Sequence, residues 1–314
     1  MNNFDIHTIL SCPDCGGDLI TNYQLPITND DEKEETKELS ESQLYCSNCR
    51  ISFNIINSVH VLLPRSQEKK SLNYIGHYEK DAELFDYFEE RECKASLHEE
   101  MRLRQYIVSK INPRCYNILD VGSGGAWLAR EIDFSKHNLI SLDLSEKNIN
   151  RALKENPNEH HFGVVGDAMN PPFKKDSIDC IVASEIIEHI VNPQEFIRRM
   201  NDILKPGGSL IISTPYKEVL QYYLCIHCNQ MTPKNAHLHS FDEKKLASFF
   251  NEEKHEGNVG GMKYHIFGNK ALTVLRTHVF LKFLPFALWK TIDKLTNLIL
   301  NKPAHIIIVY KKKK

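Results

Sequence analysis

The chain has 314 residues, of which 41% are hydrophobic and 25% charged, and its formal net charge at pH 7 is −2. This composition is typical of a globular protein with room for one large and one small domain, and the nearly neutral charge gives no reason to expect DNA as a partner. The first residues lack the pattern of a secretory signal, and no apolar run reaches the roughly 18 residues of a membrane span, so we expect a cytoplasmic protein.

Four cysteines near the amino terminus form two Cys-x-x-Cys pairs: Cys12, Cys15, Cys46 and Cys49. In a reducing compartment such pairs favour metal ligands over disulfides, and two pairs complete a tetrahedral zinc site. An acidic segment at 29–35 separates the pairs, and apolar runs at 51–56 and 59–64 predict short strands that close a zinc ribbon. Because four thiolates leave no open coordination position, we expect this zinc to be structural.

This unit resembles the Trm112-type zinc-ribbon proteins, which act as partners of methyltransferases and also occur fused ahead of bacterial methyltransferases. The similarity runs from Ile9 through both cysteine pairs and Phe53 to Pro64, and the acidic insert departs from the compact form. The resemblance implies a zinc-ribbon domain over residues 1–66. A polar linker at 65–70 follows it.

Residues 71–112 carry apolar positions at helical spacing and predict one or two helices that end before Pro113. We expect Tyr74 and Tyr78 near the mouth of the main domain, either as packing residues or as an aromatic lid. From residue 117 onward strand and helix patterns alternate, which predicts a doubly wound, Rossmann-like parallel sheet with ligands at the carboxyl ends of its strands. The expected strands are 117–121, 138–143, 161–166, 178–184 and 209–214, and the expected helices are 126–135, a helix after Ser145, 193–204 and 242–252.

The first of these strands ends in a glycine turn that lets a ligand approach the backbone, ahead of a helix start that favours electron-rich groups. Trp127 stands at the sixth position of the dinucleotide motif, where a nicotinamide site has glycine. Carboxylates end three successive strands: Asp120, Asp143 and Asp167. They suit a nucleoside that carries an amino acid, because the second can accept from ribose hydroxyls, the third from an adenine amino group, and the first can sit near a cationic centre.

The order of these motifs resembles a class I S-adenosylmethionine-dependent methyltransferase of the type 11 group, over residues 117 to about 250. Further matching segments are Ser184 to His189 and Leu204 to Gly208, while Ala126 replaces the third glycine of the family. The resemblance implies a seven-stranded methyltransferase domain over residues 71–314 and S-adenosylmethionine as the cofactor. It assigns cofactor binding to Asp120, Gly122, Ser123, Gly124, Asp143, Leu144, Asp167, Ala168 and Ser184.

Methyl transfer from a sulfonium is an in-line displacement, so positioning supplies most of the rate and a base is needed only when the acceptor must lose a proton. His189, just past the fourth strand, is the candidate base, and Glu185 is the second candidate catalytic residue. The alternative is that His189 holds Glu185 or a backbone carbonyl at a helix start.

The same segment also resembles part of the metal site of small-RNA 3′-terminal 2′-O-methyltransferases. Glu185, Glu188 and His189 match its two acids and its histidine, and His237 or His239 could supply the further histidine downstream. A second zinc site within the loop at 216–241 would use the same downstream histidines.

Cys225 and Cys228 precede His237 and His239 at a spacing that can close a second zinc site. We favour this site, because it would order the loop at 216–241 that helps wall the acceptor pocket. One histidine cannot readily serve both metals.

Residues 257–267 and 304–310 predict the last two strands, and the resemblance places the later one antiparallel between the fifth and the sixth. Between them, 269–300 is helical with a kink near Pro285. This insertion either caps the acceptor pocket, which we favour, or presents a membrane-surface face over 276–300 flanked by lysines.

The leading hypothesis is methyl transfer to a small-molecule or lipid-linked acceptor, with O-, N- and C-methylation all open. The first alternative is metal-dependent 2′-O-methylation of RNA ends, which the absence of a basic groove-like cluster opposes. The second is a zinc-ribbon scaffold with a vestigial cofactor fold, which the intact motif aspartates and glycines oppose.

Overall fold

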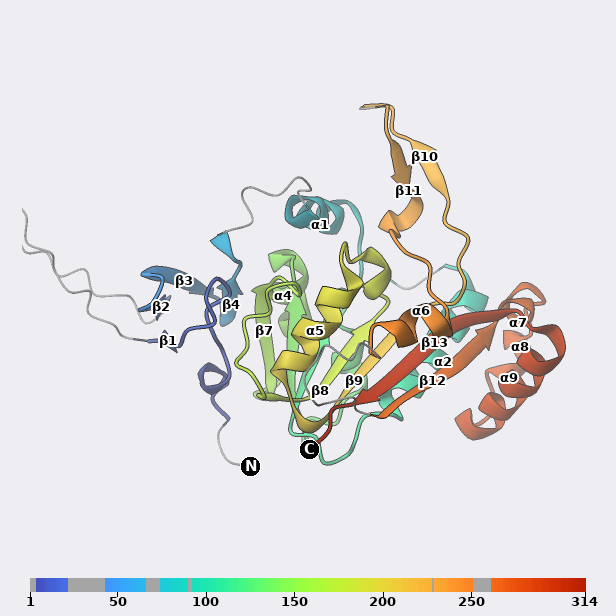
Figure 1. Cartoon of the computed structure of the whole chain (residues 1–314). Helices are drawn as coiled ribbons and strands as arrows, with labels where there is room; N and C mark the ends of the chain where they lie inside the picture. Colours follow the sequence, from blue (N-terminus) through green and yellow to red (C-terminus); the bar gives the residue numbers. More distant parts are fainter. Residues whose placement is uncertain (1–3, 22–42, 66–73, 90–91, 228, 251–260) are drawn as a thin grey trace, which may run out of the picture.

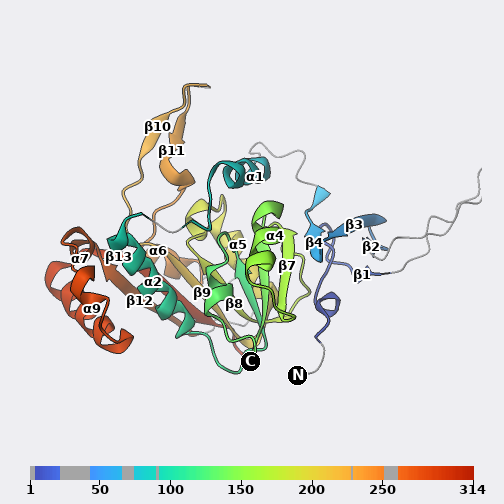
Figure 2. The same ribbon diagram turned by 180° about the vertical axis from the view of Figure 1, so that it is seen from behind.

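The computed structural model describes residues 4–21, 43–65, 74–89, 92–227, 229–250 and 261–314 (Figure 1). The acidic insert at 29–35, linker residues 66–70 and Cys228 lie outside the described residues. Within the described part, an eleven-stranded sheet has the order β1-β2-β3-β4-β7-β6-β5-β8-β9-β13-β12, and β10 and β11 form a separate two-stranded sheet. Helices cover the central sheet in front and behind, as the two opposite views show (Figures 1 and 2).

Seven strands form the central part of the sheet in the order β7-β6-β5-β8-β9-β13-β12. Five of them are parallel: β5 (Asn117–Val121), β6 (Asn138–Asp143), β7 (His161–Gly166), β8 (Ile178–Ser184) and β9 (Leu204–Pro215). The last strand, β13 (Pro303–Lys311), pairs antiparallel with both β9 and β12 (Gly261–Asn269). The predicted doubly wound α/β sheet and the antiparallel insertion of its last strand are therefore confirmed.

Successive residues of the central strands point to opposite faces, and both faces are buried. Leu119 packs in one core with Phe196 on α5 (Pro193–Ile203). Ile118 packs in the other with Leu103 on α2 (Lys94–Val108) and Leu128 on α3 (Trp127–Glu131). Burial on both faces explains why these strands read as nearly continuous apolar runs in the sequence.

Several elements differ from the predicted bounds. The helix α3 is shorter than the expected 126–135, and α6 (Glu243–Ser248) is shorter than 242–252. The strand β9 begins at Leu204, so the Lys205–Gly208 segment, expected as a turn, belongs to the strand, next to an irregularity in its pairing with β8. By contrast, α4 (Glu146–Glu155) begins as predicted after Ser145, whose side chain accepts from the Asn148 amide.

The amino-terminal unit continues the central sheet. Its strands are β1 (Leu19–Ile20), β2 (Gln43–Cys46), β3 (Ile51–Ile56) and β4 (Val59–Leu62). Each pairs antiparallel with the next one along the chain. The strand β4 then pairs in parallel with β7, with Val59 opposite Gly163 and Leu62 opposite Gly166. The sheet therefore has more strands than the seven expected, and Leu62 shares a core with Leu119.

The carboxyl-terminal insertion consists of α7 (Lys270–Val274), α8 (His278–Leu281) and α9 (Phe286–Leu300), and Pro285 precedes α9 where the kink was expected. Trp289 of α9 packs on Phe267 of β12, with ring centroids 5.1 Å apart. The hairpin of β10 (Tyr222–Leu224) and β11 (Met231–Pro233) projects from the body at the top of both views (Figures 1 and 2). The insertion lies at the end of the sheet, next to β12. Among the described helices, none is long and apolar enough to cross a membrane.

Candidate functional site

A cavity of about 460 Å³ lies at the carboxyl ends of β5, β6, β7 and β8. Each of these strands contributes the residues that directly follow it, as the doubly wound topology requires. The helix α1 (Tyr74–Leu84) and the segment after it close the cavity with three aromatic side chains: Tyr74, Tyr78 and Tyr87. Of the nine residues predicted to bind the cofactor, six line it: Gly122, Gly124, Asp143, Leu144, Asp167 and Ala168.

The glycine turn after β5 is fastened to the end of β6. The amides of Gly122 and Ser123 donate to the Leu142 carbonyl at 2.8 and 3.1 Å, and the Gly124 amide donates to Asp143 Oδ2 at 2.9 Å. Gly122 has a φ of 67°, and a Cβ there would lie 2.7 Å from Ile186 Cδ1. The positive φ favours glycine at this position, and any larger residue would also displace the end of the Ile186 side chain.

Asp143 is the polar centre of the cavity. Its two oxygens accept from the amides of Gly124 and Ser145, each at 2.9 Å. Burial raises the pKa of this carboxyl, while the amides of Ser145 and Gly124 and the side chain of Asn148 lower it. A carboxylate at the end of the second strand suits the paired hydroxyls of a ribose.

Asp120 lies behind the turn, 1% exposed, and does not line the cavity. Burial, with the Asp143 charge adding to it, raises the pKa of this carboxyl to about 7. Within the part of the chain that the structure describes, Asp120 Oδ2 and Ser123 Oγ are buried without a hydrogen-bond partner. A buried and incompletely paired carboxylate favours a nearby positive charge, so the site fits a ligand that carries a cationic centre.

Asp167, at the end of β7, accepts from the Tyr74 hydroxyl at 2.6 Å and from the Asn170 side chain at 2.9 Å. Tyr74 therefore joins α1 to the strand ends, and Tyr78, which also lines the cavity, has its pKa raised to about 12 by burial. These contacts agree with the expectation that both tyrosines lie at the mouth. The sequence analysis missed several lining residues: Tyr87, Asn148, Met169, Ile186 and Asn192. Of these, Asn148 could have been predicted, because it lies in the first turn of α4, three residues after the cap Ser145 that follows Asp143.

The end of β8 contributes Glu185 and His189 to the cavity. Ser184, predicted to bind the cofactor, is not among the residues that line it, and its hydroxyl lies 3.0 Å from Ser213 Oγ. Ser213 Oγ donates to Glu185 Oε1 at 2.9 Å, and His305 Nε2 of β13 lies 3.5 Å from Glu185 Oε2. Glu185 is therefore held from two strands with its carboxylate at the cavity wall.

His189 is half-buried, and its Nδ1 lies 3.3 Å from the Ala236 carbonyl. Burial, with the His237 charge adding to it, lowers the pKa of His189 to about 4. An imidazole with so low a pKa is neutral but is a weak proton acceptor at neutral pH. The contact with the Ala236 carbonyl is the one expected if His189 holds a backbone carbonyl.

Three ligand-type side chains meet beside the cavity. The ligand atoms of Glu188, His189 and His237 all lie within 4.8 Å of one another. Glu188 is 1% exposed and accepts from Thr214 Oγ1 at 2.9 Å, and Glu218 Oε2 lies 2.5 Å from His237 Nδ1. These bonds at the Nδ1 atoms leave the Nε2 atoms of both histidines as acceptors, which is the tautomer a metal ion requires.

This cluster differs from the predicted second zinc site. In the described part of the chain, Cys225, His237 and His239 do not form a group of ligand atoms, and His237 joins Glu188 and His189 instead. His239 Nε2 lies 3.4 Å from the Val191 carbonyl. Cys225 directly follows β10, at the loop end of the hairpin, whereas both histidines come after β11 at its base, which explains the difference.

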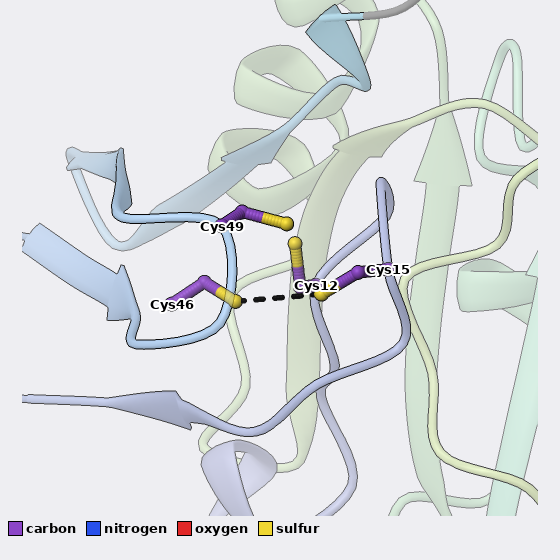
Figure 3. A group of neighbouring side chains, drawn as sticks. All are labelled: Cys12, Cys15, Cys46 and Cys49. Carbon is purple, nitrogen blue, oxygen red and sulfur yellow. Dashed lines mark hydrogen bonds between the residues drawn. The ribbon is translucent and has the colours of Figure 1, made fainter.

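Four cysteines meet in the amino-terminal unit (Figure 3). The sulfur atoms of Cys12, Cys15, Cys46 and Cys49 all lie within 4.8 Å of one another, and those of Cys15 and Cys46 are 3.6 Å apart. A zinc ion with Zn–S bonds of about 2.3 Å in tetrahedral geometry places its sulfurs about 3.8 Å apart. The four thiols therefore fit a tetrahedral zinc ion.

Comparison with known proteins matches both parts of the chain. Residues 85–253, more than half of the chain, match a family described as methyltransferase domain, and residues 3–58 match a family described as Trm112p-like protein. The ubiquinone biosynthesis O-methyltransferase of Rickettsia bellii is 31% identical over 146 residues, which are 43% of this chain and 60% of that protein. The corresponding protein of Xanthomonas axonopodis pv. citri is 26% identical over 186 residues, 56% of this chain and 77% of that protein. The match thus spans less than two thirds of the Rickettsia relative.

Among solved structures, the chain resembles a complex from Haloferax volcanii between the Trm112 methyltransferase activator and a methyltransferase. The identity is 14% and the TM-score 0.50, and the match covers 78% of this chain and 100% of that chain. This likeness shows the fold. The strand order and the cavity at the strand ends define a class I methyltransferase fold. The chain belongs to the family of S-adenosylmethionine-dependent methyltransferases and carries a Trm112p-like unit at its amino terminus.

Proposed function

We propose that the chain transfers a methyl group from S-adenosylmethionine to a hydroxyl group of a small-molecule or lipid-linked acceptor. The observation that carries this proposal is the cavity itself, which joins a nucleoside-type end at Asp143 to a second end at Glu185. Between them the wall is aromatic and apolar, with Tyr78, Tyr87 and Ile186. The relatives named O-methyltransferases support oxygen as the acceptor atom.

In this proposal the cofactor supplies a methyl group on a sulfonium, and the chain supplies its position. Asp143 accepts from the ribose hydroxyls, Asp167 accepts from the adenine amino group, and Asp120 provides the negative charge that a cationic ligand favours. Gly122, Gly124 and Ala168 form the walls that approach the ligand most closely.

We assign proton acceptance from the acceptor hydroxyl to Glu185 rather than to His189. Glu185 lines the cavity, and Ser213 and His305 hold its carboxylate. The ring of His189 is engaged elsewhere, because its Nδ1 faces the Ala236 carbonyl and its ligand atoms lie beside those of Glu188 and His237.

The test has two stages. Isothermal titration with S-adenosylmethionine comes first, and absence of binding would remove the proposal. Transfer of a labelled methyl group is then measured with three kinds of acceptor. These are phenols that carry a long alkyl tail, the same phenols without the tail, and matched amines. Labelled phenols support the proposal, and label on the amines alone would contradict the assignment to oxygen.

We propose separately that Cys12, Cys15, Cys46 and Cys49 hold one structural zinc ion. In this arrangement β4 stays on the edge of β7, so the zinc ribbon over residues 1–66 and the methyltransferase domain over 71–314 fold together. Metal analysis of the purified chain should find one zinc, and Cys46→Ser should abolish it. A wild-type chain that retains no zinc would contradict this assignment.

A second candidate function is metal-dependent methylation of an RNA 3′ end. The meeting of Glu188, His189 and His237 beside the cavity favours it, since these residues fit a divalent cation. Such an ion would supply a positive charge next to the acceptor hydroxyl, and the carboxylate of Glu218 would orient His237. Methyl transfer to a short single-stranded RNA that is lost with chelator and restored by magnesium or manganese would favour this candidate. Transfer to phenols that chelator leaves unchanged would exclude it.

A further inference from the structure

The carboxyl-terminal insertion, residues 270–302, exposes an unusual amount of apolar surface. Ten large apolar side chains of this segment are exposed, and the most exposed among them are Val274 at 79%, Phe280 at 79%, Phe283 at 78%, Leu298 at 73% and Ile299 at 80%. So many exposed large apolar side chains in one segment indicate a site of interaction with another molecule or a membrane.

The insertion is nevertheless firmly attached to the rest of the protein. Trp289 of α9 is 3% exposed and packs on Phe267 of β12, with ring centroids 5.1 Å apart. Arg102 of α2 donates to the carbonyls of Leu281 and Leu284 at 3.0 and 2.8 Å. The inner side of α8 and α9 is thus fixed by packing and hydrogen bonds, and the exposed apolar side chains are what remains on the outer side.

These outer side chains do not line the cavity described above. Among the described residues that line the cavity, none belongs to the insertion. The structure therefore does not place the insertion over this cavity, where we had expected it as a cap. The apolar surface needs a different occupant.

The charges of the segment indicate which occupant fits. Its basic residues are Lys270, Arg276, Lys282, Lys290, Lys294 and Lys302, and all of them are exposed. Its single acidic residue, Asp293, is 3% exposed and accepts from the Gly268 amide at 3.1 Å. Six basic residues against one acidic residue give the segment a formal charge of +5, in a chain whose net charge is −2.

We propose that residues 270–302 bind the surface of a membrane that contains anionic lipid. An apolar helical face flanked by lysines lies in the interface, with its apolar side chains among the acyl chains and its cationic groups at the headgroups. Phe280 and Phe283 flank Lys282, so aromatic and cationic groups alternate where the segment is most exposed. A second copy of the chain is a poor occupant, because two segments of charge +5 repel each other.

This inference goes beyond methyl transfer. Membrane binding is measured without cofactor or acceptor, so its failure and the failure of the proposed function are separate results.

The experiment is co-sedimentation of the full chain with vesicles of phosphatidylcholine alone or of phosphatidylcholine and phosphatidylglycerol in equal parts. We expect binding to the anionic vesicles, which added salt weakens, and little binding to the neutral ones. The double variant Phe280→Ser with Phe283→Ser should bind the anionic vesicles at least about tenfold more weakly, and Lys290→Glu with Lys294→Glu should do the same. The matched control is Phe85→Ser, which removes a phenylalanine that is 62% exposed outside the segment and should leave binding unchanged.

Absence of binding to anionic vesicles would overturn the proposal, and so would a double phenylalanine variant that binds like the wild type. A wild-type dimer in solution that the same variant dissociates, without any vesicle binding, would assign the surface to self-association instead. The cooperative melting and the zinc content of each variant show that it is folded.

Discussion

His305 Nε2 on β13 lies 3.5 Å from Glu185 Oε2, at the end of β8. The other nitrogen of the ring, Nδ1, lies 3.8 Å from Glu99 Oε1 on α2. The antiparallel insertion of β13 beside β9 brings this histidine to Glu185. The carboxylate proposed as the base is therefore positioned by the last strand of the chain.

Glu185→Gln should lower kcat by about 100-fold or more, because the amide keeps the shape of the side chain but accepts no proton. The affinity for S-adenosylmethionine should stay as in the wild type, since Glu185 is assigned to the acceptor end of the cavity. Steady-state methyl transfer and isothermal titration measure the two effects. Glu195→Gln, on the outer side of α5, is the matched control and should change neither. If Glu185→Gln had the kcat of the wild type, Glu185 would not be the base, and another group would accept the proton.

Asp143→Asn should weaken the binding of S-adenosylmethionine by about 10- to 100-fold. The reason is the loss of hydrogen bonds to a charged acceptor, each worth about 1.5–3 kcal/mol, where about 1.4 kcal/mol is a factor of ten. The matched control is Asp133→Asn, on the exposed loop after α3, which should bind like the wild type. Equal dissociation constants for Asp143→Asn and the wild type, measured by titration, would show that the ribose is held elsewhere.

Six of the residues predicted to bind the cofactor line one cavity, and the sequence could place them together because their signals are local. Asp143 and Asp167 each stand directly at the end of an apolar strand, and parallel strands bring such ends to one edge of the sheet. The glycine turn after β5 is likewise a local signal. No knowledge of long-range pairing is needed to place these residues together.

The acceptor end depends on contacts between distant segments, which periodicity does not reveal. His305 reaches Glu185 only because β13 inserts beside β9. His237 meets His189 because the chain returns after the hairpin, with the Leu238 amide donating to the Glu188 carbonyl at 2.8 Å. The spacing of Cys225 and His237 suggested a local zinc site, but the strands of the hairpin separate them.

Asp120 predicts a specific pH dependence. Its pKa in the folded chain, about 7, lies well above the ordinary value of an aspartate, so the folded state binds this proton more tightly than the unfolded state does. Without cofactor, the free energy of unfolding should therefore fall as pH rises from about 4 to about 7, by about 4 kcal/mol from this group, and then level off. Urea unfolding of the wild type and of Asp120→Asn measures this as the difference between two pH profiles. Parallel profiles would show that Asp120 does not hold the proton.

The same group predicts how cofactor binding responds to pH. A cationic ligand favours the ionised carboxylate, so the affinity for S-adenosylmethionine should rise by up to about tenfold per pH unit between pH 5 and pH 7. In Asp120→Asn this part of the pH dependence should disappear. Titrations at four pH values test the prediction, and a slope that persists in the variant would assign it to another group.

Leu62 should couple the stability of the amino-terminal unit to that of the methyltransferase domain. It is 0% exposed, lies on β4 opposite Gly166 of β7, and shares a core with Leu119. Leu62→Ala should therefore lower the free energy of unfolding by about 2–5 kcal/mol. The two tryptophans of the chain, Trp127 and Trp289, both belong to the methyltransferase domain, so their fluorescence reports on that domain alone. In urea, the fluorescence midpoint should shift to lower concentration in Leu62→Ala and stay unchanged in Ile56→Ala, a control in β3 that is 39% exposed. If Leu62→Ala left the midpoint of the tryptophan transition unchanged, the two parts would unfold independently, despite the strand pairing between them.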